Sequence, residues 1–542
     1  MKTTSRRWGT IITLVVGIAA LAGFLAGCSD DNEGTIDAGP ESSRITIEEI
    51  IFNPKSPAPG DTMRATAVVT ASTPNLGDYV KYSWTGTGGT FIESNKSSVR
   101  WVAPTNSGVF NLTCKATNSV NSASASDDVF VGELKEFIAS RAGEMHPRSS
   151  DDNLYYLSPP AHADSGVIVR KKNMISGDDV VVFPDETRAG SQYRFDADAQ
   201  HAAHMVTEGV FRPRLNVVHD DLTAEIQTVI ARDQRPFPYR PNEFSYPYVS
   251  REGLAIAYQG GLLDQTAPPS QGGTDTFAVF IYQIASQETQ RAVFVGDNFY
   301  PSFSSDAGHL VFVSDRGGTF EWEYYALPMS NYVATVDTMP DALIKLTNSG
   351  GLFGSESVPP SPRPYAWSPN AAFPVMAVIA NNDKLWLVSA TGGDILVDIP
   401  GKVSDMVWSG AGDQLAVASF DSDTGLGSIY LVTPSGNFTT LHSGAERDRL
   451  IVPTWAPGDE YIIYAIDRSG SIWYELVEVD GATLAKPARI TPAWSAGDAA
   501  DYGPPLMSWR SSWQPGVLNA YLFFVDMDTP RVMSLDLSGL TP

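Results

Sequence analysis

Three stretches of this chain align without a gap: YPYVSREGLAIAY at 246–258, YPSFSSDAGHLVF at 300–312 and VPTWAPGDEYIIY at 452–464. Each begins with an aromatic or apolar residue and a proline, continues through a short turn with small and acidic residues, and ends in an apolar run. A module that returns every 40 to 65 residues indicates an array of small β-sheets. None of these sheets can bury its apolar faces alone, so we expect them to stack.

The residue before the acidic turn sets the register of the repeat. Equivalent positions are Ser149, Phe195, Val249, Phe303, Trp367, Trp408, Trp455 and Trp509. Their spacings of 41 to 64 residues are close to the length of a four-stranded propeller blade. We therefore predict an all-β fold with a β-propeller of eight blades. Seven blades is the alternative, because the first two copies and the last are weak.

The strand after each turn is expected to be apolar on both faces, as in LVFV at 310–313, because a blade lies between two neighbours. The turn, this strand and the SDRGG that follows at 314–318 together resemble the TolB-like propeller repeat. The resemblance covers about 145–540 and is clearest over 246–480. It implies a fold, and by family analogy a protein-binding role in the cell envelope, but no activity.

A closed ring needs its two ends to meet, since an open ring leaves an exposed strand edge. Residues 133–140 (ELKEFIAS) precede the first blade, and the last blade ends soon after 532–535. We predict that the first segment supplies an outer strand to the last blade. The propeller domain is then 133–542.

The N-terminus reads as an export signal. Lys2, Arg6 and Arg7 precede an uncharged run over 9–27, and LAGC at 25–28 resembles the lipobox of bacterial lipoproteins. That resemblance implies a signal peptide at 1–27, cleavage before Cys28 and acyl chains such as palmitate on this cysteine. A transmembrane anchor is the alternative, because 19 apolar residues can just span a bilayer.

Residues 28–43 are predicted to be a flexible acidic tether, because they are rich in charge and poor in apolar side chains. Ser29 is not the residue that retains lipoproteins in the inner membrane of enteric bacteria, which favours the outer membrane. DDNE at 30–33 resembles a tract that sends some lipoproteins to the cell surface. A plain solvated linker is the alternative, so the protein is expected to face either the periplasm or the exterior.

Residues 44–132 contain about seven short alternating runs, which predict an immunoglobulin-like sandwich. Trp84 is the expected core tryptophan. Motifs such as WVAP at 101–104 make the segment resemble PKD-like modules of surface proteins. Cys114 lies where antibody-type domains place a cysteine but has no partner on the early strand, so we expect a buried, unreactive thiol.

The net charge is −25. Removal of the three basic signal residues leaves 34 basic against 62 acidic residues, a net charge of −28. Such a chain repels phosphate backbones, which excludes nucleic acid as a partner. With Cys28 acylated, Cys114 is the only other cysteine and no intramolecular disulfide can form.

Catalytic motifs are missing from the sequence: there is no Gly-x-Ser-x-Gly elbow, P-loop, haem motif or His-Glu-x-x-His helix. We expect no enzyme activity and no cofactor. Calcium is the one ion for which the sequence offers a candidate site. DSDTG at 421–425 resembles the start of a calcium loop through Asp421 and Asp423, although a hairpin turn is the simpler interpretation. The acidic and histidine-containing stretch 196–204 is interpreted as a blade turn and strand rather than a metal site.

Two segments exceed what a blade needs, 260–276 and 319–341. Long loops on a rigid scaffold often carry binding residues. The second contains a candidate binding group of Phe320, Trp322, Tyr324 and Tyr325. The alternative is that Trp322 and Tyr324 are alternate residues of a strand packed against the next blade.

The sequence thus predicts a lipid-anchored, non-enzymatic binding or scaffold protein of the cell envelope, with a propeller face that engages a protein partner. Glycan binding or polysaccharide cleavage is the alternative, because PKD-like modules accompany polysaccharide-active proteins. Two carboxylates facing each other across the propeller funnel would favour the enzyme.

Overall fold

The computed structural model consists of antiparallel sheets, in agreement with the predicted all-β class. The residues that the structure describes are 45–71, 80–118, 121–138, 145–147, 153–158, 168–173, 176–182, 192–195, 202–207, 213–218, 227–230, 245–250, 255–263, 274–286, 288–293, 297–315, 322–331, 343–347, 365–380, 383–456, 458–468, 471–480, 487–491, 494–495, 507–509, 521–526 and 531–536. The predicted signal peptide, Cys28 and the tether lie outside them. Among the described residues, no helix has the length and apolarity needed to cross a bilayer.

The first part of the chain forms two facing sheets. One has the order β1-β2-β5-β4 and the other β3-β6-β7. This four-plus-three strand order is that of constant-type immunoglobulin sandwiches. The bounds are β1 (Ile45–Asn53), β2 (Thr62–Ala71), β3 (Lys81–Gly86), β4 (Thr90–Ile92), β5 (Ser98–Val102), β6 (Gly108–Thr117) and β7 (Ser122–Val131).

One apolar core lies between these sheets and takes alternate residues from each. Met63 and Trp101 come from the first sheet, and Trp84, Leu112 and Cys114 from the second. The indole of Trp84 donates its N–H to the Lys96 carbonyl at 2.9 Å, which satisfies its one polar atom. The predictions of Trp84 as a core residue and Cys114 as a buried thiol are confirmed.

Beyond the sandwich, the described residues form eight further sheets with four strands in a row, each strand antiparallel to its neighbours. Their strands are β9 (Met145–Pro147), β10 (Asn153–Ser158), β11 (Ile168–Asn173), β12 (Asp179–Val181); β13 (Gln192–Phe195), β14 (Ala202–Thr207), β15 (Pro213–Val218), β16 (Gln227–Ile230); β17 (Ser245–Val249), β18 (Ala255–Leu263), β19 (Thr274–Gln283), β20 (Glu288–Val293); β21 (Asn298–Phe303), β22 (His309–Ser314), β23 (Glu323–Pro328), β24 (Ile344–Lys345); β25 (Tyr365–Trp367), β26 (Val375–Ala380), β27 (Lys384–Ser389), β28 (Asp394–Val397); β29 (Lys402–Trp408), β30 (Leu415–Asp421), β31 (Leu426–Val432), β32 (Phe438–Ser443); β33 (Arg449–Trp455), β34 (Tyr461–Arg468), β35 (Ser471–Glu478), β36 (Ala488–Arg489), with β37 (Trp494–Ser495) beside β35; and β38 (Met507–Trp509), β39 (Tyr521–Asp526), β40 (Arg531–Asp536), β8 (Leu134–Ile138). A single-turn 3-10 helix, η4 (Met329–Asn331), follows β23.

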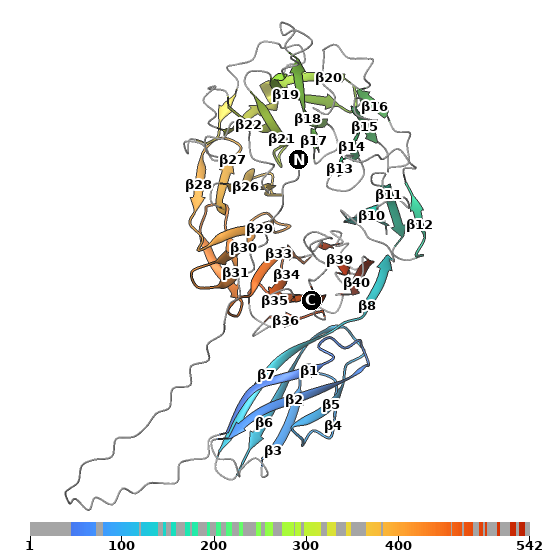
Figure 1. The fold of residues 1–542 in the computed structure, drawn as a ribbon, viewed down its shortest axis with the longest axis vertical. Coiled ribbons are helices and arrows are strands. Elements are labelled where there is room, and N and C mark those ends of the chain that lie inside the picture. The colour runs from blue at the N-terminus through green and yellow to red at the C-terminus, as the bar shows by residue number, and fades with distance from the viewer. Residues whose placement is uncertain are drawn as a thin grey trace, which may run out of the picture.

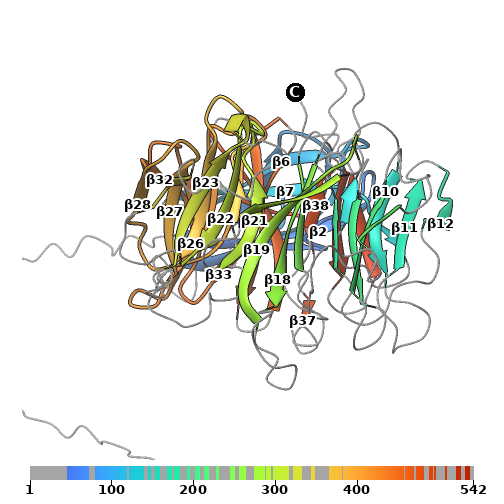
Figure 2. The ribbon, with the colours of Figure 1, turned by 90° about the horizontal axis from the view of Figure 1, so that it is seen from above.

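The sheets surround a common centre, and the sandwich adjoins the outer edge of the ring near β8 and β36 (Figure 1). Turned by 90°, the ring is a layer of steeply inclined strands (Figure 2). Strand β8 pairs with β40, with Leu134 opposite Leu535 and Ile138 opposite Val532. The predicted strap is therefore confirmed: a strand from before the ring supplies the outer edge of the last sheet, which ties the two ends together.

The predicted anchor residues share one structural position. From Phe195 to Trp509, each of the seven is the last residue of the first strand of its sheet, while Ser149 lies outside the described residues. Three anchor indoles reach the preceding sheet. Trp367 donates to Ser302 Oγ at 3.2 Å, and Trp408 and Trp455 donate to the carbonyls of Ala366 and Val407 at 3.0 Å. The repeated aromatic thus joins neighbouring sheets, as predicted.

The acidic turn after the anchor is held by its own side chains. Ser304 Oγ accepts the His309 N–H at 2.9 Å, and Asp306 Oδ1 accepts the Gly308 N–H at 2.9 Å. Two sheets further on, Ser409 Oγ accepts the Gln414 N–H at 3.2 Å. Short polar side chains in this sequence therefore replace the missing backbone partners of a tight turn.

The second strand of each repeat carries the buried core. In β22, all four residues of 310–313 are fully buried. Phe299, Val311 and Trp322 of one sheet form a common apolar cluster with Met376 and Val378 of the next. Burial on both faces explains why these strands are continuously apolar rather than alternating.

Candidate functional site

The predicted binding group at 320–325 is not an exposed loop. Trp322 is only 1% exposed and Tyr324 5%, and both pack in the apolar cluster shared with the next sheet. Tyr325 is half-buried and stacks on Phe312 at 6.3 Å between ring centroids. The binding-loop interpretation is wrong for Trp322 and Tyr324, because Tyr324 of β23 and Trp322, which directly precedes that strand, both pack into the interface between sheets. Phe320 lies outside the described residues.

The other predicted long loop is also shorter than expected. Strand β18 continues to Leu263, and β19 begins at Thr274, so residues at both ends of 260–276 pair with each other across the hairpin. Only 264–273 lie outside the described residues. The pairing was missed because the segment is rich in Gly, Pro and Ser, residues that normally indicate a loop.

Asp421 forms a hairpin turn at the end of β30. Its Oδ1 accepts the Asp423 N–H at 3.0 Å, and its Oδ2 accepts the Thr424 hydroxyl at 2.9 Å. These hydrogen bonds, the Asp423 N–H above all, lower the pKa of the Asp421 carboxyl. The contacts match the hairpin interpretation. Within the described residues, no group of three or more His, Cys, Asp or Glu side chains is arranged to hold a metal ion. Residues 196–201 lie outside them, and His204 belongs to strand β14.

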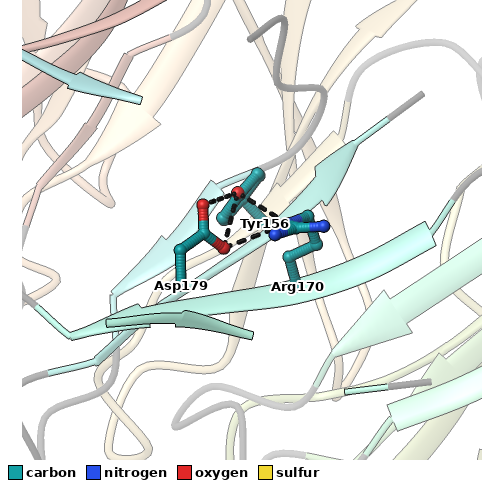
Figure 3. A network of polar contacts seen from close by, with 3 residues as sticks. All are labelled: Tyr156, Arg170 and Asp179. Carbon is teal, nitrogen blue, oxygen red and sulfur yellow. Dashed lines mark hydrogen bonds and ion pairs between the residues drawn. The ribbon is translucent and has the colours of Figure 1, made fainter. Parts of the chain in front are cut away.

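A closed polar network lies in the first sheet of the ring (Figure 3). The hydroxyl of buried Tyr156 donates to Asp179 Oδ2 at 2.9 Å and accepts from Arg170 Nε at 3.1 Å. Arg170 Nε also lies 3.0 Å from Asp179 Oδ1. Burial, and then the Asp179 carboxylate, raise the pKa of Tyr156. The three groups satisfy one another across β10, β11 and β12, so the network stabilises the sheet.

A concave feature lies where the sandwich meets the ring. A cavity of about 510 Å³ opens between β1 and β7 on the sandwich side and β34, β35 and β36 on the ring side. This volume falls in the range of small-molecule sites. We refer to it as the junction cavity. Its charged lining divides into a cationic group, Lys55, Arg468 and Arg489, and an acidic group, Glu49, Asp127, Asp128 and Glu475.

Trp473 is the centre of the ring-side wall. Two guanidinium groups lie by its indole, Arg468 at 5.1 Å and Arg489 at 4.9 Å from the ring centroid. Both distances are within cation–π range. Arg468 is held in place by Asp448, with Nε and Nη2 donating to the two carboxylate oxygens at 2.5 and 2.7 Å. This bidentate pair fixes the plane of the guanidinium.

Behind Trp473, the Glu475 carboxylate accepts hydrogen bonds from neutral donors. Its Oε1 accepts the Trp473 indole N–H at 2.8 Å, and its Oε2 accepts the Tyr464 hydroxyl at 3.2 Å. Burial raises the pKa of Glu475, although both of these hydrogen bonds favour its charged form. Both carboxylate oxygens have donors, so Glu475 orients the indole, and the attraction of Arg489 also favours the charged form of this carboxyl.

Arg489 is held from the ring side and touches the sandwich through its backbone. Its Nε donates to the Thr491 carbonyl at 2.7 Å, and its own carbonyl accepts the Ser56 hydroxyl at 3.3 Å. Burial lowers the pKa of Arg489. Lys55, on the exposed turn after β1, also has a lowered pKa, through burial first and then repulsion by Arg489. Like charges from both domains therefore converge on the cavity.

These residues were not predicted as a site from the sequence. Arg468 ends β34 and Trp473 lies in β35, both within the region where the propeller repeat is clearest. The missing information was their proximity to β1, more than 400 residues earlier in the chain. The sequence around each arginine does not indicate a cluster of charges, because Arg468 and Arg489 come from different strands, β34 and β36.

Comparisons with known proteins find similar solved structures but no family. No protein-family model and no curated protein sequence matches this chain. Among solved structures, TolB from Acinetobacter baumannii is 10% identical and covers 84% of this chain and 79% of its own, with a TM-score of 0.30. An oligogalacturonate lyase in complex with manganese is 9% identical, covering 75% and 93%, with a TM-score of 0.42. Dipeptidyl peptidase 4 from Porphyromonas gingivalis is 11% identical, covering 71% and 58%, with a TM-score of 0.44.

At these identities the likeness concerns fold alone. The chain is an all-β protein whose ring of sheets is similar to TolB-like propellers. Other similar structures include prolyl endopeptidases and a further oligogalacturonate lyase.

Proposed function

We propose that this protein is a lipid-anchored binding or scaffold protein of the cell envelope, without catalytic activity, whose propeller engages a protein partner. The observation that carries the proposal is the place of the sandwich. It adjoins the outer edge of the ring and does not lie over the ring face seen in Figure 1. A spacer attached at the edge can raise the ring from a membrane while leaving that face accessible.

The short connection between the two parts supports the spacer role. Strand β7 ends at Val131 and β8 begins at Leu134, so only two residues separate the sandwich from the closing strand of the ring. The Gly132 N–H donates to the Pro57 carbonyl at 3.0 Å. A Cβ at Gly132 would lie 2.1 Å from the Phe130 ring, so only glycine fits this close approach. A short, hydrogen-bonded linker holds the sandwich at a fixed position beside the ring.

The anchor itself is proposed from the sequence at 25–28. Acylation of Cys28 would hold the chain at the outer membrane, facing the periplasm or the exterior, since several buried acyl chains give stable attachment. The sandwich is proposed to be a PKD-like module, on the basis of its sequence motifs and its strand order.

Glycan recognition is the second candidate, and the junction cavity is the observation that favours it. The cavity has the size of a small-molecule site and presents polar groups from both domains around a tryptophan. A glycan ligand is compatible with the same anchored scaffold.

The proposal is tested by crosslinking in intact cells, with recovery of the full chain and identification of bound proteins, combined with protease shaving. A Cys28→Ser variant provides the matched control for the anchor. We expect the wild-type chain to fractionate with membranes and to crosslink to a defined envelope protein, and the variant to leave the membrane fraction. Membrane fractionation unchanged in Cys28→Ser would contradict the anchor. The absence of any specific crosslinked protein would contradict the scaffold.

A further inference from the structure

The exposed apolar side chains of the protein are not evenly distributed. Among the described residues, seven large apolar side chains are exposed, and four of them lie between 373 and 438, in two neighbouring sheets. They are Phe373 at 58%, Ile395 at 43%, Leu396 at 48% and Phe438 at 38% exposed. We refer to these four residues as the rim patch. Single apolar residues on a surface are ordinary, whereas several together mark an interaction surface.

Contacts of the surrounding backbone bring the members of the rim patch together. The Ala390 N–H donates to the Pro374 carbonyl at 3.0 Å, which places the turn that carries Phe373 beside the hairpin that leads into β28. A Cβ at Gly436 would lie 2.9 Å from Ile395 Cγ2, so the turn before β32 touches β28. The first residue of β32 is the remaining phenylalanine of the patch. Figure 1 shows β28 at the outer rim of the ring, on a part of the rim that the sandwich does not adjoin.

Strand β28 is also the outermost strand of its sheet. Among the described residues it pairs with β27 alone, so its other backbone edge faces no further strand. An edge of this kind can accept an extended chain, whose backbone hydrogen-bonds to it while its side chains contact the residues of the edge strand. The rim patch therefore combines apolar contact with an open strand edge.

The two faces of β28 differ in chemistry. Ile395 and Val397 face the next sheet, since Val397 is buried in the apolar cluster shared with that sheet and the two residues are alternate positions of one strand. The opposite face carries Asp394 and Leu396, and Asp398 follows the strand directly. One face thus offers apolar contact, and the other a leucine between two carboxylates.

The charge of these two sheets indicates a positively charged partner. Residues 365–443 contain seven acidic residues against two lysines and no arginine, a net charge of −5. Both lysines already lie in ion pairs, Lys384 with Asp398 at 3.6 Å and Lys402 with Asp383 at 3.3 Å. A second copy of this chain, or an anionic lipid surface, would be repelled by this excess, whereas a cationic segment would be attracted.

We propose that the rim patch and the open edge of β28 bind an extended segment of a partner protein in which apolar and basic residues alternate, added as a strand beside β28. The apolar residues of the segment would pack on Ile395 and Phe438. The basic residues would cover Leu396 with their aliphatic stems and approach Asp394 and Asp398 with their charged ends. The inference rests on the proposed protein-binding function and adds to it a contact surface at the outer rim of the ring.

The test is fluorescence anisotropy of a labelled heptapeptide of alternating lysine and valine, titrated with the full chain in mild detergent. We expect saturable binding that weakens as salt is raised, because the attraction between charges is screened. A peptide with proline in place of the central valine should bind at least about tenfold more weakly, because proline lacks the N–H that the strand edge requires. A heptapeptide of alternating glutamate and valine should not bind, because it adds negative charge to an acidic surface.

Variants at the surface of the ring locate the binding site. The double substitution Ile395→Ser and Leu396→Ser removes the apolar contacts and should weaken binding of the lysine–valine peptide by at least about tenfold. Asp394→Asn should weaken it by about threefold and keeps the test decisive if the double variant fails to fold. Val180→Ser is the matched control, because Val180 is likewise an exposed residue, at 45%, on the outermost strand of another sheet, β12. Its affinity should equal that of the wild type.

Several results would overturn the proposal. They are the absence of saturable binding of the lysine–valine peptide up to about 1 mM, equal binding of the proline peptide, and wild-type affinity in both the double variant and Asp394→Asn. Dimerisation of the wild type that the double variant loses would assign the patch to a second copy. Binding to phosphatidylcholine vesicles lost in the same variant would assign it to a membrane.

Failure of this inference is distinguishable from failure of the proposed function. A partner crosslinked in intact cells to the wild type and equally to the double variant would keep the envelope scaffold and reject the rim patch as its contact surface. Loss of that partner in the double variant, with the partner retained in Val180→Ser, would support both.

Discussion

Replacing Trp455 with phenylalanine tests whether the repeated aromatic holds neighbouring sheets together. Trp455 ends β33, is 7% exposed, and donates its indole N–H to the Val407 carbonyl of the preceding sheet at 3.0 Å. The substitution removes this donor and leaves a carbonyl in the interface without its partner, which costs about 1–3 kcal/mol. It also leaves a void of roughly 40 Å³, worth about 1 kcal/mol at the measured cost per unit of cavity volume. We therefore expect a loss of about 2–4 kcal/mol in the free energy of unfolding.

The assay is urea unfolding of the wild type and the variant, with hydrogen exchange of the backbone amides around β29 and β33. The loss should appear as faster exchange in these two strands before it appears in the sandwich. Phe373→Ala is the control, because Phe373 is 58% exposed and its substitution should change stability by less than about 0.5 kcal/mol. A change of that small size in Trp455→Phe would refute the role of the indole in joining sheets.

Three further predictions follow from buried or strained groups. Burial raises the pKa of the Cys114 thiol to about 11. A thiol reagent at pH 8 should therefore label Cys114 only after the protein unfolds, and rapid labelling of the native protein would contradict this expectation. Burial lowers the pKa of His442 against the opposing effect of Asp448, so folding disfavours protonation of this imidazole. The free energy of unfolding should therefore be highest above pH about 6.5 and decrease as the pH falls below that value. Urea unfolding at pH 7 and pH 5 should show a smaller decrease in His442→Gln than in the wild type. Gly401 and Gly458 both have positive φ, but a Cβ at Gly401 would lie 2.5 Å from the Phe420 carbonyl oxygen, whereas a Cβ at Gly458 would lie in open space. Gly401→Ala should therefore lower the thermal midpoint of unfolding clearly more than Gly458→Ala does. Equal shifts would show that the backbone conformation alone matters.

The junction cavity and the closure of the ring depend on the same strand, β8. Strand β8 leaves the sandwich and closes the ring beside β40, which brings β1 and β7 against β35 and β36 of the neighbouring sheet. The strand that stabilises the ring thereby also builds the cavity. A change that displaced β8 would be expected to affect both ring closure and the cavity.

Much of the architecture could be predicted from the sequence alone. The period of the repeat identified the anchor residues, and seven of them end the first strand of a sheet. The need to cover a strand edge predicted the pairing of 133–140 with 532–535. Both follow from local rules: apolar residues on both faces of a strand require two neighbours, and an open ring has an edge to protect. Trp84 and Cys114 were predicted as core residues from the immunoglobulin-like pattern of 44–132, and both lie in the apolar core between the two sheets.

Only the tertiary structure decided which aromatic and charged side chains are accessible together. Trp322 and Tyr324 were candidate binding residues in a long loop, yet they lie just before and within β23 and fill the interface with the next sheet. Arg468, Trp473 and Arg489 looked like ordinary strand residues, yet they meet Lys55 at the junction cavity. The physical reason is that burial and charge clustering depend on contacts between distant segments. Periodicity reports which face of a strand is apolar, but not which other strand comes to cover it.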